Sequence, residues 1–178
     1  YLQHADGTPL VWVGDTAWVL HQNLSRDDVR LYLNDARDKG FTLIQLMTVN
    51  GWALKEQRNY FGETPYLDDA PWRLNPAYWD HLAWVIDRAA RRGLYVLLVY
   101  GSPGRKDERV PFVRSPQEAY EYGNALGSYL RGKRNLIWCS GSDVTPDNSR
   151  SVGPMGMEGW HAMAEGIADG VNGVQNFD

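Results

Sequence analysis

Short apolar runs alternate with longer amphipathic stretches along the chain. Apolar side chains that recur every three or four residues predict helices with one buried face, and short continuous apolar runs predict buried strands. Each run is followed by a loop, an amphipathic stretch and a turn that contains glycine. The pattern predicts strands at 10–13, 41–49, 94–100 and 135–140, and helices at 26–39, 76–92, 116–130 and 159–169.

Capping residues mark the ends of these helices. Ser25 precedes a helix whose first turn holds two acidic residues, and Asn75 and Ser115 each stand directly before a proline, all typical of helix N-termini. Gly40 and Gly93 follow the first two helices, where glycine is favoured. Residues 170–173 carry neither a helix signal nor a strand signal.

Four strand–helix units in this order predict a parallel sheet with right-handed crossovers. Two folds use that order, an open doubly wound sheet and a closed barrel. The first strand is followed by Gly14-Asp15-Thr16-Ala17-Trp18, which lacks the glycine fingerprint of a dinucleotide site, and no phosphate-binding loop is found. We therefore expect an α/β protein of the (β/α)₈ TIM barrel class, in which residues 1–178 form a single partial domain with about the first four βα units.

Composition narrows the possible partners. The chain has a formal net charge of −4, and its Lys and Arg are scattered apart from Arg131, Lys133 and Arg134 at the end of a helix, so nucleic acid is not an expected partner. No stretch approaches the roughly 18 apolar residues that cross a bilayer, so no membrane partner is expected. Cys139 is the single cysteine and is expected to be buried.

The histidines give no sign of a metal centre. None of them has the paired spacing of a metal site, and each is expected on the surface or on a helix face. Neither a metal nor another cofactor is expected. The four are His4, His21, His81 and His161.

The aromatic residues favour a carbohydrate ligand. Eight Trp and ten Tyr stand against four Phe, and Trp and Tyr combine an apolar ring with a polar group. Such rings stack on the C–H faces of sugars, although many of them are equally expected to fill the core.

Candidate chemistry lies where the strands end, because barrel enzymes place their reactive groups on the loops after the strands. Glycoside hydrolysis needs two carboxyl groups about 5 to 10 Å apart. Asp143 is the candidate catalytic residue; Asp15 lies nearly opposite it in a closed barrel, so the partner is expected from later strands. The candidate substrate-binding residues are Asp15, Trp18, Gln45, Asn50, Trp52, Tyr100 and Trp138.

The motifs at these positions resemble the apiosidase-like glycoside hydrolases, family 140. Residues 13–18, 39–45 and 92–96 are similar to the first three strand signatures of the family, and 135–138 with Gly141, Ser142, Asp143 and Pro146 to the fourth. Residues 160–167 are similar to the fourth helix. This sequence has Ser140-Gly141-Ser142-Asp143 where relatives often have Gly-Gly-Asp.

The resemblance implies a bacterial glycosidase that cleaves apiose-type linkages in plant cell-wall pectin, in the periplasm or outside the cell. It also implies that Asp143 is catalytic and that a glutamate on a later strand, beyond Asp178, is its partner. We accordingly expect the other half of the barrel in the same longer chain or in a second copy. The 178 residues alone are not expected to turn over substrate.

Two alternatives remain open at this point. A non-catalytic carbohydrate-binding or degenerate barrel would keep the aromatic residues without the reaction. A broader cellulase-like barrel hydrolase would differ only in its substrate.

Overall fold

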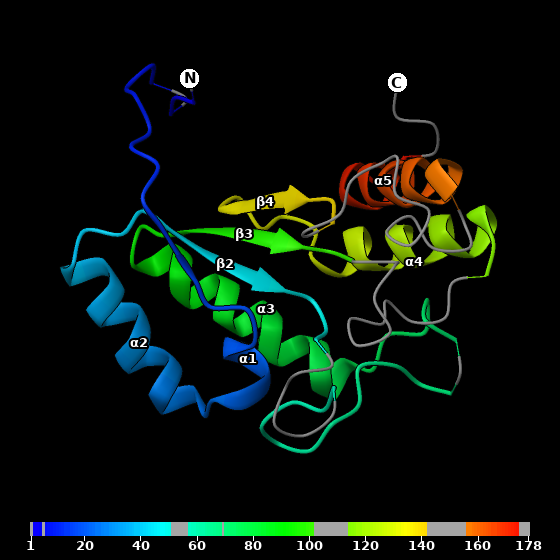
Figure 1. The fold of residues 1–178 in the computed structure, drawn as a ribbon, viewed down its shortest axis with the longest axis horizontal. Helices are drawn as coiled ribbons and strands as arrows, with labels where there is room; N and C mark the ends of the chain where they lie inside the picture. Colours follow the sequence, from blue (N-terminus) through cyan, green and yellow to red (C-terminus); the bar gives the residue numbers. More distant parts are fainter. Residues whose placement is uncertain are drawn as a thin grey trace.

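Strands and helices alternate along the chain, as the hydrophobic pattern predicts. The computed structural model describes residues 2–4, 6–50, 57–68, 70–101, 114–141 and 156–174. In this part of the chain (Figure 1) the elements are β1 Gly14–Thr16, α1 Leu20–Asn23, α2 Arg26–Asp38, β2 Leu43–Met47, α3 Pro76–Arg91, β3 Tyr95–Val99, α4 Pro116–Tyr129, β4 Leu136–Cys139 and α5 Gly156–Asn172.

The four strands form one parallel sheet in the order β1-β2-β3-β4. This order separates the two folds that the sequence allows. A doubly wound sheet reverses its strand order at a switch point, whereas a barrel adds every strand on the same side of the previous one. The sheet is therefore a segment of a βα barrel, and the predicted fold class is confirmed.

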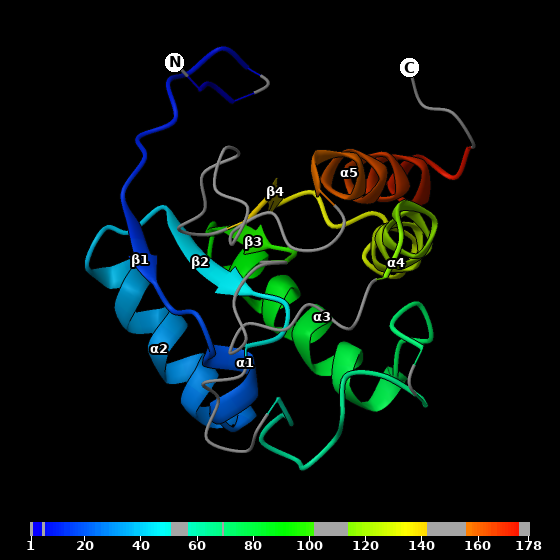
Figure 2. The same cartoon turned by 45° about the vertical axis from the view of Figure 1, so that its right-hand side comes forward.

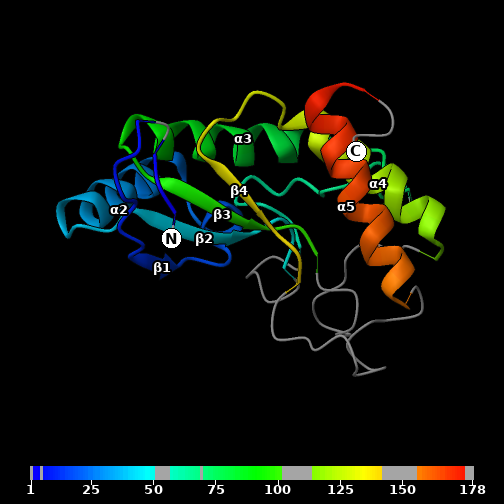
Figure 3. The same ribbon diagram turned by 90° about the horizontal axis from the view of Figure 1, so that it is seen from above.

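One face of the sheet packs against the helices, and this interface holds the main core. Ile44 and Leu46 of β2 and Val96 and Leu98 of β3 are fully buried there against apolar side chains of the helices. Figures 2 and 3 show the helices grouped around that side of the sheet. We call the opposite face, which corresponds to the barrel interior, the inner face.

The predicted capping residues begin three of the helices. Ser25 Oγ accepts a hydrogen bond from the Asp28 amide, Ser115 Oγ accepts one from the Glu118 amide, and Asn75 accepts one from Ala77. Each bond satisfies an amide that the helix itself leaves without a partner. Local sequence therefore determines where these helices begin.

The first strand is not where the apolar run predicts it. Pairing with β2 is formed by Gly14–Thr16 rather than by residues 10–13, and Val11 and Trp12 are 65% and 45% exposed. A Cβ on Gly14 would lie 3.0 Å from the Leu43 side chain, so glycine allows close approach to β2. The prediction of a strand at 10–13 was wrong, because a run of apolar residues does not determine which residues of an edge strand pair with the sheet.

Two further elements differ from the prediction. The short helix α1 has no sequence signal because four residues are too few to show a helical period. Helix α5 continues to Asn172, through residues 170–172, which show no helical signal. Gly170 packs there against the α4 backbone, and this packing overrides the low helix propensity of glycine. Among the helices that the structure describes, none is long and apolar enough to cross a membrane.

Candidate active site

The carboxyl ends of the four strands meet at one edge of the sheet, which we call the carboxyl edge. Strand pairing continues there by one residue, because the Thr48 amide donates to Val99 O at 3.0 Å and the Tyr100 amide donates to Cys139 O at 3.1 Å. These bonds hold the ends of β2, β3 and β4 together. The residues that immediately follow the strands therefore start from fixed positions.

A buried polar network fixes the end of β2. The Thr48 carbonyl accepts from the Tyr78 hydroxyl at 2.9 Å and from His21 Nε2 at 3.0 Å. The His21 and Tyr78 rings meet edge to face, with centroids 5.8 Å apart. Both side chains are fully buried. Of the two predicted positions for His21, surface or helix face, the structure has the helix face: His21 lies on α1, and its ring packs into the core as a donor to a strand end.

Burial lowers the pKa of His21 from 6.5 to about 3. This effect is larger than that of the hydrogen bond to the Thr48 carbonyl, which raises the pKa. Histidine is thus neutral in the folded protein, with its proton on Nε2. In the unfolded chain the ring takes up a proton below pH 6.5, so acid favours unfolding. Between pH 6.5 and about 3, this one group lowers the free energy of unfolding by about 1.4 kcal/mol for each pH unit.

We expect His21→Gln to remove that part of the pH dependence. The free energy of unfolding is measured with urea at pH 7, 6 and 5. Below pH 6 it should fall less in the variant than in the wild type, by about 1.4 kcal/mol for each pH unit. His161→Gln is the matched control, since His161 is exposed on α5. Equal pH slopes for wild type and His21→Gln would show that the ring is not buried as a neutral group.

Asn50, a predicted substrate-binding residue, is held at the carboxyl edge by its backbone. Its amide donates to Gln22 Oε1 at 2.8 Å, and its carbonyl accepts from Gln22 Nε2 at 3.2 Å. Both residues are fully buried. Helix α1 thus supplies His21 and Gln22, which together fix the backbone of 48–50. Sequence patterns do not indicate Gln22, because its partner is 28 residues away.

Tyr100 and Trp138 lie together on the helix side of this edge. Their ring centroids are 6.3 Å apart, and Tyr100 is only 4% exposed within the main core. Burial raises the pKa of the Tyr100 hydroxyl, while its hydrogen bond to Ser140 opposes that rise. Trp138 is in register with Leu98 and packs against the same core. Of the two roles that the sequence allows for Trp138, sugar-binding surface or core, the structure supports core.

Asp15 also faces the helices. It pairs in register with Ile44, whose side chain is in the helix-side core, and side chains in register share a face. The Tyr32 hydroxyl of α2 donates to Asp15 Oδ2 at 2.6 Å, and the Thr16 amide donates to Oδ1 at 2.9 Å. The carboxylate and the hydrogen bond from Tyr32 tie β1 to α2. Its position corrects the expectation of a substrate-facing carboxylate.

Gln45 lies on the inner face. It is half-buried and in register with Thr16 on one side and Leu97 on the other. Trp18, also half-buried, follows β1 at the carboxyl edge, where its carbonyl accepts from the Met47 amide at 3.0 Å. These two predicted binding residues are therefore near the barrel interior. Trp52 and Asp143 lie outside the described residues. Within the described ranges, no group of three acidic, His or Cys residues could hold a metal ion.

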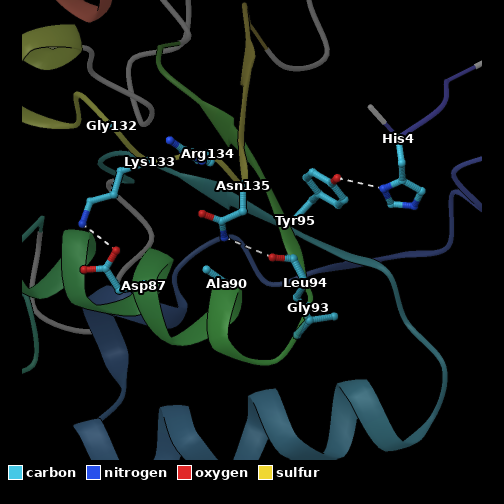
Figure 4. Close-up of a pocket in the computed structure, with 10 residues that line it drawn as sticks. All are labelled: His4, Asp87, Ala90, Gly93, Leu94, Tyr95, Gly132, Lys133, Arg134 and Asn135. Carbon is cyan, nitrogen blue, oxygen red and sulfur yellow. Dashed lines mark hydrogen bonds and ion pairs between the residues drawn. The ribbon is translucent and has the colours of Figure 1, made fainter. Parts of the chain in front are cut away.

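A pocket of about 460 Å³ opens at the opposite, amino edge of the sheet (Figure 4). Lys133 Nζ bonds Asp87 Oδ1 at 2.7 Å, and Tyr95, on the inner face, bonds His4 at 3.2 Å. In barrel enzymes the amino edge contributes to stability and the carboxyl edge holds the chemistry. We therefore assign the pocket no catalytic role. Nearby, the Arg131 guanidinium donates to Gly170 O near the end of α5, a different helix from α4, whose end this basic cluster was predicted to stabilise.

A singly wound parallel sheet with buried polar groups at its carboxyl edge defines the class of βα-barrel proteins. The chain belongs to the family of apiosidase-like catalytic domains, whose model matches residues 1–177. A comparison with curated protein sequences found no match.

Solved structures support the same fold. A glycoside hydrolase family 5 protein from Bacteroides vulgatus is 30% identical, with a TM-score of 0.77 over 98% of this chain and 36% of its own. A second protein, described as a glycoside hydrolase, is 28% identical, with a TM-score of 0.76 over 98% of this chain and 37% of its own. An exo-β-1,4-mannosidase from an Opitutaceae bacterium, 13% identical, shares the fold, with a TM-score of 0.65 over 98% of this chain and 32% of its own. The chain thus spans about a third of the length of these proteins.

Proposed function

We propose that this chain is part of a glycosidase that cleaves apiose-type linkages of pectic polysaccharides in plant cell walls. The observation that carries the proposal is the match to the apiosidase-like catalytic domain over residues 1–177. The geometry of the carboxyl edge supports it, because three strand ends are fixed there by buried hydrogen bonds. A rigid set of strand ends is what a reaction that depends on carboxyl groups at fixed separation requires.

In this proposal Asp143 is the general acid. Gly141, buried directly after β4 and with a positive φ of 72°, turns the chain at the carboxyl edge. Asp143 follows Gly141 by two residues in the sequence. The acid donates its proton to the leaving oxygen as the glycosidic bond breaks. A second carboxylate either attacks the anomeric carbon or takes a proton from the attacking water.

The second carboxylate is a glutamate of a later barrel strand. Within the described residues the sheet ends at β4, and the matched structures are almost three times as long as this chain. We propose that the remaining strands belong to the same longer protein and complete the barrel against the edges of β1 and β4. A second copy of the chain is the alternative source. Size-exclusion chromatography of the full-length protein distinguishes them, since closure within one chain predicts a monomer.

Substrate binding is assigned to the residues that reach the inner face or the carboxyl edge. Gln45, Asn50 and Trp18 have that position, and we propose that Trp52 completes the site. Tyr100, expected there from the sequence, is instead buried in the core on the helix side. His21, Gln22 and Tyr78 act as positioning residues, because they bond the backbone of 48–50 and do not face the inner side. Asp15 and Trp138 serve the same edge structurally, through α2 and the core.

A carbohydrate-binding barrel without catalysis is the second candidate, favoured by the aromatic content of the chain. Calorimetry and a reducing-sugar assay on the full-length protein, with apiose-bearing pectic oligosaccharides, separate the two. Release of sugar supports the glycosidase. Binding without release would contradict it and favour the second candidate. Turnover of cellulose or mannan but not of pectic oligosaccharides would retain the glycosidase and reject the substrate.

A further inference from the structure

A strongly basic groove runs between α2 and α3 on the outside of the barrel wall, away from the inner face. The two helices lie side by side in Figures 1 and 2. The groove has a volume of about 200 Å³. Its lining residues are Arg30, Leu33, Asn34, Arg88, Arg91 and Arg92, and we call it the arginine groove. Four of these six side chains are cationic in a protein whose net charge is negative.

Trp84 of α3 holds three guanidinium groups in place beside the groove. Arg26, Arg30 and Arg88 lie 5.0, 5.3 and 5.2 Å from the centroid of its ring. The indole is itself stacked on His81, with 5.8 Å between centroids and 18° between planes. Cation–π contacts of this kind restrict flexible arginine side chains. A ligand therefore meets guanidinium groups that are already partly ordered.

The positive charge of the groove is poorly compensated within the described residues. Asp27 pairs with Arg30, and none of the side chains that line the groove is acidic. Burial, and then repulsion from Arg91, Arg30, Arg26 and Arg92, lowers the pKa of Arg88. Like charges brought together with little compensation from acids work against folding, which is typical of a site that an anion completes.

The arrangement suits a chain of spaced carboxylates. Arg26 and Arg30, one helical turn apart, place their Cβ atoms about 5–6 Å from each other, and a guanidinium group bonds a carboxylate in a bidentate manner. Double-stranded nucleic acid carries one charge per roughly 1.7 Å of its axis, so it binds to an extended basic surface. The net charge of −4 does not favour such a surface. A sugar acid polymer carries one charge per residue and fits a short groove better.

We propose that the arginine groove binds an acidic polysaccharide of the galacturonan type, and so anchors the polymer whose side chain is cleaved at the carboxyl edge. The inference rests on the proposed function, because pectic side chains are attached to polymers of galacturonic acid. Helices of a βα barrel run antiparallel to the strands, so Arg91 and Arg92 at the end of α3 lie on the amino-edge side of the wall, and Arg30 of α2 lies nearer the carboxyl edge. The groove therefore lies on the outside of the wall toward the amino edge, where an extended polymer could reach both it and the proposed site.

Affinity electrophoresis of the full-length protein in gels containing polygalacturonate tests this inference. The probe is compared with fully methyl-esterified polygalacturonate, which has the same chain without charge. The variant Arg88→Gln/Arg91→Gln is expected to bind polygalacturonate at least about tenfold more weakly than the wild type. It loses two guanidinium groups, each of which could bond a carboxylate in a bidentate manner. Added salt should weaken wild-type binding, and the esterified polymer should not be retained.

The matched control is Arg58→Gln/Arg114→Gln, which removes the same charge from exposed positions outside the groove. It should bind polygalacturonate within about twofold of the wild type, and circular dichroism should show both variants folded. Equal weakening in both variants would reduce the effect to net charge and overturn the inference, as would unchanged binding in the groove variant. Equally tight binding of RNA would overturn the choice of an acidic polysaccharide, and equally tight binding of heparin would overturn the choice of the galacturonan type.

The outcome is separable from that of the proposed function. Short, uncharged apiose-bearing oligosaccharides should be cleaved equally by wild type and by the groove variant, because they reach only the carboxyl edge. Cleavage of these oligosaccharides without binding of polygalacturonate would reject the groove alone. Groove-dependent binding without any cleavage would reject the proposed reaction and leave the groove as a binding site.

Discussion

Asp143→Asn is expected to lower kcat of the full-length protein by about 100- to 10,000-fold, the usual contribution of a positioned general acid. The amide keeps the size of the side chain and its ability to donate a hydrogen bond, but it cannot transfer a proton to the leaving oxygen. KM should change little. The measurement is initial-rate hydrolysis of a pectic oligosaccharide across pH, in which the variant should lose the alkaline limb of the profile.

Aryl glycosides sharpen this test. A phenolate leaving group is stable as an anion and needs little protonation. Asp143→Asn should therefore slow hydrolysis of an aryl glycoside far less than hydrolysis of a linkage between two sugars. Asp38→Asn is the control, because Asp38 is an exposed carboxylate at the end of α2. Undiminished hydrolysis of the natural linkage by the Asp143 variant would reject the assignment. An equal loss with both kinds of leaving group would instead assign Asp143 to nucleophilic attack.

The starts of α2, α3 and α4 could be predicted from the sequence to the residue, because their signals are local. Ser25, Asn75 and Ser115 bond amides two or three residues away, and such contacts depend on chain neighbours alone. The edge strand β1 could not be placed, since its register depends on the fit of Gly14 against Leu43, 29 residues later. Local patterns thus determine helix ends, and tertiary contacts determine strand register.

Two of the predicted binding residues lie where the sequence places them. Within the described residues, Trp18 after β1 and Asn50 after β2 lie at the carboxyl edge. The position of a residue along a strand does not show which face of the sheet its side chain occupies, so the helix-side positions of Asp15 and Trp138 could not be predicted. The network of His21, Gln22 and Tyr78 was not predictable, because its members interact only after α1 and α3 pack beside β2.

Helices α4 and α5 are packed backbone to backbone through four glycines. A Cβ on Gly123 would lie 2.2 Å from Met163 O, and one on Gly166 would lie 2.2 Å from Tyr120 O. Gly127 and Gly170 make equally close approaches, at 2.4 Å. Contacts below 3 Å to a carbonyl of a neighbouring helix cannot be relieved by a rotamer change, so the helices would have to separate.

Gly166→Ala is therefore expected to lower the free energy of unfolding by about 3 kcal/mol or more, at the upper end for overpacking in a core. The sign makes the test decisive. Alanine favours a helix over glycine by about 1 kcal/mol, so an unpacked α5 would become more stable. Ser128→Ala, exposed on α4, is the control and should change stability by no more than about 0.5 kcal/mol. Urea unfolding of the full-length protein measures all three, and a stabilised Gly166→Ala would show that α4 and α5 are not in contact through their backbones.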